Sequence, residues 1–381
     1  MGAQAAPYLP QSDSEVLERL PSRPGDRSMQ EIRRLRAVVA RDPRQVEAAV
    51  QLARRYFEQA LSEGDPRYVG YAQAALGPWW TLAEPPVAVL VMRATLRQYR
   101  HDFAGALGDL QQAVSRDPAD GRAWSLRAVI HLVQADYDAS RHACAQLAPL
   151  VDELTASGCA AFIDGLTGRA RQAHDALARA LSRSPAVDPE QQMWVLVRLA
   201  EIAWRLNDPR LAEGHFRRAL ALGITDNFLS AAYADFLLDH GRAPEVVALL
   251  QQSTRADALL LRLALAEHAT GGAGLQAHQA ALADRYAASR LRGDTTHEQE
   301  ESRFTLQILG RPEQALALAQ RNWEVQREPR DARVVLEAAL ALQRPDAAVP
   351  VIKWMKASRI EDVYLQRLAA AIEALVPKAG K

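Results

Sequence analysis

Cysteine is scarce in this sequence, with two in 381 residues, and no hydrophobic run is long enough to cross a bilayer. Even the apolar run from Val87 to Met92 is soon followed by Arg93 and Arg97. Charge of one sign is also missing, because 46 Lys and Arg balance 46 Asp and Glu. The sequence therefore predicts no membrane span and no nucleic-acid partner.

Motifs for catalysis or metal binding are missing as well. The nine histidines are scattered without a His-Glu-x-x-His pair, paired CxxC motifs are absent, and no Gly-x-Ser-x-Gly nucleophile elbow occurs. The glycine clusters at 271–274 and 293–296 do not lead into Gly-Lys-Ser/Thr, so a phosphate-binding loop is not expected. We predict no catalytic residue, no metal and no cofactor.

Helix-forming residues dominate what is present. Hydrophobic residues make up 49% of the chain, mostly Ala and Leu, and the alternating Val, Ile and Thr runs of strands are absent. The sequence thus predicts an all-α protein. Short breaks between the helices are marked by an acidic residue or Ser followed by Pro, at 42–43, 65–66, 84–85, 117–118, 184–185, 208–209 and 328–329.

The spacing of these breaks indicates a repeat. Pro85 and Pro118 are 33 residues apart, and Pro185 follows after 67 more, close to two such steps. The second helix of each step carries a small residue, a large apolar one four later and a small one three after that. The matching sets are Ala106, Leu110 and Ala113; Ala173, Leu177 and Ala180; Ala212, Phe216 and Ala219; and, more loosely, Ser140, Cys144 and Leu147.

These sets resemble the A-x3-F-x2-A…P signature of the tetratricopeptide repeat (TPR) family, and Trp124 sits where the family's first helix carries its Trp. The resemblance covers about Pro86 to Leu222 and continues more weakly to Ser358. It implies a right-handed superhelical solenoid of antiparallel helix pairs.

We expect this repeat domain to span residues 28–376, with about nine helix pairs and a closing helix over 361–375. Residues 1–27 are expected to be extended or partly disordered because of their prolines, and 377–381 to form a disordered tail. Gly77-Pro78-Trp79-Trp80 is expected to be a longer connection, since the period is broken there.

In the family, the first helix of each pair lines a concave groove. Transferring those positions by phase predicts the binding residues Gln98, Tyr99, Arg122, Ser125, Phe162, Trp194, Glu201, Trp204, Arg205, Phe228, Asp235 and Asp239. Aromatic anchors beside a few charges are typical of protein or peptide recognition. The alternative is that Trp194 and Trp204 fill the space between neighbouring pairs, and the sequence leaves both interpretations open.

The two cysteines are predicted to lie at similar height on neighbouring helices. Cys144 and Cys159 each stand about seven residues from a turn near Val151 and Asp152. Packed helix axes are roughly 8–10 Å apart, whereas a disulfide needs Cα atoms within about 7 Å. A buried thiol at Cys144 is therefore expected, with a disulfide to Cys159 as the alternative.

Ala3-Gln4-Ala5 before Ala6-Pro7 has the form of a signal-peptidase site, which favours a periplasmic or secreted protein over a cytoplasmic one. The leading hypothesis is a non-enzymatic scaffold that binds a protein or extended peptide in its groove, within a bacterial envelope complex. One alternative is a polysaccharide-binding subunit of a secretion or cell-wall system, with Trp79, Trp80 or Trp194 stacking on sugar rings. Another is a hydrolase or metal protein with an unrecognised site.

Overall fold

The computed structural model describes residues 12, 27–184 and 186–376, and within them every regular element is a helix. This confirms the all-α prediction. None of the helices in the described ranges is long and apolar enough to cross a membrane. The expected signal-peptidase triplet Ala3-Gln4-Ala5 and the tail 377–381 lie outside the described residues, as does nearly all of the expected N-terminal segment. The first helix begins at Arg27, one residue before the predicted start.

Consecutive helices pack as pairs, which makes the described part of the chain a helical solenoid. A leading helix, α1, covers Arg27–Arg41. The first half continues with α2 (Val46–Glu63), α3 (Arg67–Ala75), α4 (Gly77–Trp80), α5 (Val87–Tyr99), α6 (Phe103–Arg116), α7 (Gly121–Val133), α8 (Tyr137–Leu147), the 3-10 turn η1 (Ala148–Leu150), α9 (Glu153–Asp164) and α10 (Ala170–Arg183).

The second half repeats the same arrangement and ends in an unpaired helix. Its elements are α11 (Pro189–Arg205), α12 (Pro209–Leu220), α13 (Asn227–Asp239), α14 (Ala243–Leu250), α15 (Asp257–Thr270), α16 (Leu275–Leu291), α17 (Glu298–Gln307), α18 (Pro312–Val325), α19 (Pro329–Ala341), α20 (Pro345–Ser358) and the closing α21 (Val363–Glu373).

Aspartate side chains start many of these helices. Asp102, Asp136 and Asp208 each accept a hydrogen bond from the backbone N–H three residues on, which satisfies one free donor of the first turn. At the predicted break 117–118 the cap lies slightly later, because Asp120 caps α7. Local sequence thus sets the helix boundaries to within a few residues.

The repeat signature forms the core between paired helices. In α6, Ala106, Leu110 and Ala113 are completely buried. Ala212, Phe216 and Ala219 are buried in the same way in α12. Small residues let the second helix approach the first closely, and the larger residue fills the space between them.

The expected connection at Gly77–Trp80 is instead the short helix α4, so that prediction is wrong. Trp79 is only 7% exposed and packs into the N-terminal core. Arg93 of α5 secures the following turn, since its Nη1 donates to the carbonyl oxygens of Trp80 at 2.7 Å and Leu82 at 3.0 Å. The burial of the Trp79 indole stabilises α4, and the spacing of residues in the sequence does not reveal that burial.

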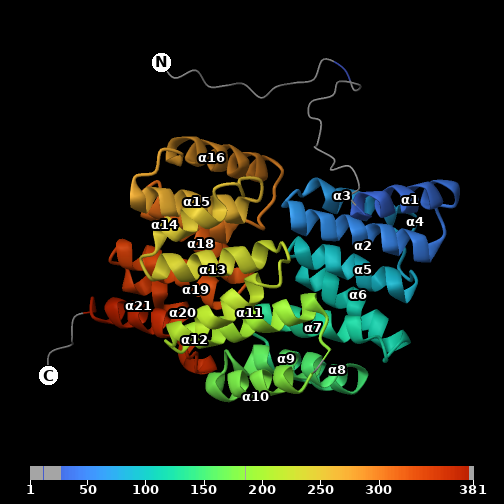
Figure 1. Ribbon diagram of the computed structural model, residues 1–381, viewed down its shortest axis with the longest axis horizontal. Coiled ribbons are helices and arrows are strands. Elements are labelled where there is room, and N and C mark those ends of the chain that lie inside the picture. The colour runs from blue at the N-terminus through green and yellow to red at the C-terminus, as the bar shows by residue number, and fades with distance from the viewer. Residues whose placement is uncertain (1–11, 13–26, 185, 377–381) are drawn as a thin grey trace.

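The solenoid curls until its last helices meet its middle ones. Figure 1 shows the chain passing down one side through α5 and α6, turning through α7 to α10, and rising on the other side through α11 to α16 before α18 to α21 return. One hydrophobic core joins residues of α5 to α9 with residues of α18 to α21. The backbone N–H of Arg327 donates to the carbonyl of Val133 at 2.7 Å, and the Trp354 indole donates to the Tyr137 hydroxyl at 3.1 Å.

Cys144 of α8 and Cys159 of α9 form a disulfide, with their Cα atoms 5.8 Å apart. The sequence argument favoured a buried thiol because helix axes lie farther apart than a disulfide can span. That comparison fails here since both residues lie on the facing sides of their helices, where Cα atoms approach more closely than the axes do.

Candidate functional site

Two adjoining apolar cavities lie along the first helices of five consecutive pairs. The larger, of about 860 Å³, is bounded mainly by α2, α5 and α7. The smaller, of about 320 Å³, is bounded by α7, α8, α9 and α11. They share the lining residues Ser125, Val129, Leu147 and Thr155, so they form one continuous depression. We call this depression the apolar groove.

Four of the twelve predicted binding residues line the apolar groove. They are Arg122 and Ser125 of α7, Phe162 of α9 and Trp194 of α11. Periodicity places them together, because each lies on the inner face of the first helix of its pair. The positions transferred from the TPR family therefore include residues at the middle and at one end of the groove.

Trp194 closes one end of the groove and is 38% exposed. Its ring packs directly over Gly158 of α9, where an added Cβ would lie 2.5 Å from the indole. Trp194 thus both fills the space between neighbouring pairs and presents an aromatic face to the groove. The packing between pairs that the sequence offered as the alternative is found at this residue, and its role in binding stays a prediction.

Trp204 lies elsewhere. Its ring makes an edge-to-face contact with Phe236, with centroids 5.8 Å apart, and it packs against the core of α11 to α15. At this position the indole fills the space between pairs and is not part of the groove.

Arg198 is a residue that the phase transfer missed. Its guanidinium lies 4.7 Å from the ring centres of both Phe162 and Phe228, and its Nη1 is 2.7 Å from Glu201. Such stacking on aromatic rings is favourable for a cation that is partly removed from water. Two predicted residues, Phe228 and Glu201, therefore serve to hold this arginine.

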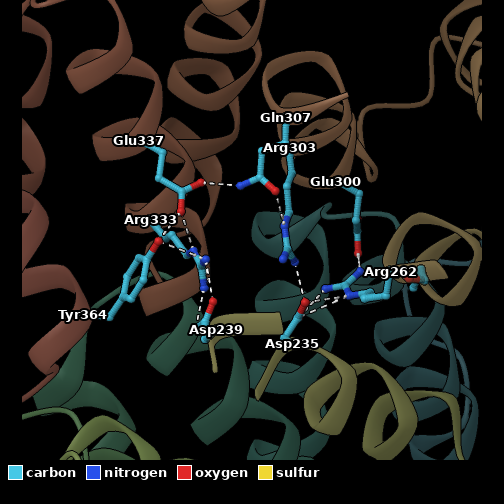
Figure 2. Close-up of polar contacts among 10 residues, drawn as sticks. Asp235, Asp239, Arg262, Glu300, Arg303, Gln307, Arg333, Glu337 and Tyr364 are labelled. Carbon is cyan, nitrogen blue, oxygen red and sulfur yellow. Dashed lines mark hydrogen bonds and ion pairs between the residues drawn. The ribbon is translucent and has the colours of Figure 1, made fainter. Parts of the chain in front are cut away.

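The predicted acids Asp235 and Asp239 do not face an open groove. They belong to an ionic network, shown in Figure 2, whose members come from α13, α15, α17, α19 and α21. We call it the interior ionic network, and it comprises Asp235, Asp239, Arg262, Glu300, Arg303, Gln307, Arg333, Glu337 and Tyr364.

Each acid in this network is matched by arginine. Asp235 lies 2.8 Å from Arg262 and 2.5 Å from Arg303. Asp239 accepts two hydrogen bonds from Arg333, at 2.8 and 2.9 Å. Burial alone would raise the pKa of Asp235, but the two arginines outweigh it and hold the pKa below its usual range. These acids bind the C-terminal helices to α13.

The remaining predicted residues, Tyr99, Arg205 and Gln98, are not among those that line the apolar groove. Tyr99 makes an edge-to-face contact with Phe57, and burial and then the carboxylates of Asp294 and Asp257 raise its pKa. Burial lowers the pKa of Arg205, which Glu201 partly opposes. Gln98 is half-buried at the end of α5. The sequence could not predict which residues lie outside the groove, because this depends on α17 and α19, which contact α13 over 68 and 94 positions of the chain.

Arg54, Val91 and Met92 line the larger cavity but were not predicted. Arg54 precedes the part of the chain where the repeat is in phase, because the irregular α3–α4 segment lies between α2 and α5. Val91 and Met92 lie within that part, on α5, where the transfer selected Gln98 and Tyr99 instead.

Groups with chemical reactivity are few in the described ranges. No cluster of three or more His, Cys, Asp or Glu side chains there could hold a metal ion. His174 and His215 bring their Nε2 atoms within 3.2 Å on the second helices α10 and α12, away from the groove.

No protein-family model matches the sequence, and no curated protein matches it. Among solved structures, the chain is similar to one chain of the APC/C hetero-tetramer Cut9–Hcn1, with 12% identity and a TM-score of 0.42. That similarity covers 91% of this chain and 52% of the other, so the chain spans about half the length of that neighbour.

A second neighbour is the TPR domain of P58(IPK), with 14% identity, 92% of this chain and 94% of that one covered, and a TM-score of 0.21. At such scores the likenesses themselves carry no argument about function. The chain's own helix pairs and their buried signature residues make it a helical repeat array consistent with the TPR resemblance.

Proposed function

We propose that the protein is an interaction scaffold that binds an extended peptide segment of a partner protein in the apolar groove. The observation that carries this proposal is the continuity of the two cavities across α2, α5, α7, α9 and α11. A groove crossing five successive helices suits an elongated ligand better than a compact one. Exposed Trp194 at one end offers an aromatic anchor.

The polysaccharide alternative is less well supported by the geometry. Of the tryptophans expected to stack on sugar rings, Trp79 is buried in the N-terminal core. Trp80 is half-buried against the same core, so Trp194 is the exposed member of the three, and three such side chains do not form a row along the groove. We therefore propose no second function.

Blocking the groove tests the proposal. A displayed library of random peptides is screened against the full chain, and binders are measured against the variant Ser125→Trp. Ser125 is exposed and lines both cavities, so an indole there should fill the groove without disturbing the core. Affinity should fall at least about tenfold, the loss expected when a buried anchor is displaced.

Gln172→Trp is the matched control, since Gln172 is exposed on α10, a helix that contributes no residue to the groove lining. It should bind peptides as the wild type does. The proposed function would be contradicted by peptides that bind the Ser125→Trp variant as tightly as the wild type, or by a library that yields no binder.

An oxidising compartment, such as the bacterial periplasm, is part of the same proposal. The disulfide between Cys144 and Cys159 supports it, because such bonds persist mainly outside the reducing cytosol. Mass spectrometry of the protein from its native cells, alkylated before any reduction, checks this. Two alkylated thiols would argue for a cytoplasmic location.

A further inference from the structure

The charged residues of the apolar groove are unevenly matched. The lining of the larger cavity includes three charged residues: Arg54, Asp120 and Arg122. Asp120 is already engaged as the cap of α7, where its Oδ1 accepts from the Ala123 N–H at 2.9 Å. Within the described ranges, neither arginine has a hydrogen-bond or ion-pair partner. The groove therefore carries two guanidinium groups that form no ion pair with another residue of the described ranges.

The carboxylate of Glu58 offsets the positive charge of Arg54 only in part. Glu58, one turn from Arg54 on α2, is 2.7 Å from Arg55, and Glu31 of α1 is 3.1 Å from the same arginine. Burial, followed by repulsion from Arg122, lowers the pKa of Arg54. The two guanidinium groups thus act on each other across the cavity between α2 and α7.

The surroundings of this pair are apolar. Val91 and Met92 of α5 and Leu126 of α7 line the same cavity. A planar guanidinium binds a carboxylate through parallel hydrogen bonds, and partial removal from water strengthens the contact. The site therefore combines a carboxylate receptor with apolar walls, and a ligand must offer both features to match it.

We propose that Arg54 and Arg122 recognise an internal Asp or Glu side chain, flanked by apolar residues, in the peptide that occupies the groove. This inference rests on the proposed function and adds the chemistry of the partner. Polyanions such as nucleic acid are a poorer match, because their recognition needs a wider basic surface than two arginines in an apolar depression.

A peptide selection tests the inference on the full chain. Random nine-residue peptides are displayed with fixed flanking sequence at both ends, so that no free carboxyl terminus enters the groove. The selected peptides should be enriched in Asp or Glu next to apolar residues. Resynthesised peptides with Gln for Glu or Asn for Asp should bind at least about tenfold more weakly.

Variants of the protein then locate the effect. Arg54→Gln with Arg122→Gln should abolish the acidic enrichment while apolar positions stay selected. Arg54→Glu with Arg122→Glu should redirect selection toward Lys and Arg, a gain that damage to the fold cannot imitate. Arg171→Gln on α10 removes an exposed arginine outside the groove lining and is the control.

The outcomes separate the two proposals. Apolar binders without acidic enrichment, or enrichment that survives both arginine variants, would overturn this inference while leaving the groove as a peptide site. A selection that returns no binder would overturn the proposed function itself.

Discussion

At the scale of single residues, buried ion pairs hold neighbouring helices together. Arg93 and Asp109 are both buried and lie 2.6 Å apart, joining α5 to α6 beneath the turn that follows α4. Arg97 adds a second contact to the same carboxylate at 2.9 Å. The pair secures a part of the chain where the repeat is irregular.

Removing one member of this pair should be costly. Asp109→Ala leaves the Arg93 charge buried without its carboxylate, and the free energy of unfolding should fall by about 3–5 kcal/mol. Urea denaturation followed by circular dichroism measures the change. Arg93→Met with Asp109→Leu should be clearly more stable than Asp109→Ala. Equal stability of the wild type and Asp109→Ala would contradict this account.

His215 should make stability depend on pH. Burial and then the neighbouring His174 lower the pKa of His215 to about 4. A histidine in the unfolded chain has a pKa of about 6.5. Between this pH and about 4, the unfolded chain binds a proton at this position and the folded chain does not. Folding therefore favours the neutral imidazole. The contribution of neutral His215 to the free energy of unfolding is fully present above pH 6.5 and is lost as the pH falls toward 4.

We therefore expect the stability difference between wild type and His215→Gln to shrink over that pH window. Denaturation midpoints at pH 7.5, 6, 5 and 4.5 provide the measurement. A difference that stays constant across these values would show that His215 titrates alike in the folded and unfolded chains.

At the scale of elements, the disulfide fixes the second helix of one pair to the first helix of the next. Cys144 and Cys159 also line the smaller cavity, so the bond holds one wall of the apolar groove. Besides packing, Arg141 of α8 contacts Asp164 at the end of α9 and donates to Thr167 just after it.

Reducing this disulfide should lower stability. The cysteines are 15 residues apart, and closing a loop of that length stabilises a fold by about 3 kcal/mol. Thermal unfolding with and without reductant should reveal the loss. The variant Cys144→Ser with Cys159→Ser is the control, because its unfolding should not respond to reductant. A wild type equally insensitive to reductant would speak against the bond.

At the scale of the whole molecule, the interior ionic network and the shared core decide the shape. Asp239 and Arg333 are 94 positions apart in the chain, and Asp235 and Arg303 are 68 apart. These contacts draw the C-terminal helices against α13 and leave the apolar groove as the open part of the inner surface. A solenoid of the same repeats that did not curl back on itself would expose both the apolar groove and the face of α13 that carries Asp235 and Asp239.

Reversing the two acids should loosen this closure. Asp235→Lys with Asp239→Lys places positive charge against Arg262, Arg303 and Arg333 in a partly buried site, where like charges repel strongly. Amide hydrogen exchange should become faster in α17 and α19, and small-angle scattering should show a larger radius of gyration. Exchange in α1 to α3 should change little.

Asp346→Asn is the comparison for this experiment. Asp346 forms an exposed ion pair with Arg344, and exposed pairs contribute little. Its exchange pattern should match the wild type. If the reversed variant also matched it, the shared hydrophobic core rather than the charges would be responsible for closure.

The sequence by itself determined most of the helices, their pairing and the inner face on which the groove-lining residues lie. Those features follow from local rules: Asp caps, proline at helix starts, and small residues such as Ala106 and Ala113 spaced for close helix packing. Four predicted residues, Arg122, Ser125, Phe162 and Trp194, line the groove because the helical period alone places them on the inner face.

Only the tertiary structure decided which part of that inner face stays open. Asp235 and Asp239 have the right phase, yet arginines from α15, α17 and α19 neutralise them. Arg54 has no recognisable phase, yet it faces Arg122 across the larger cavity. Periodicity describes one helix relative to its neighbours, whereas the curvature that brings α19 back to α13 accumulates over many pairs.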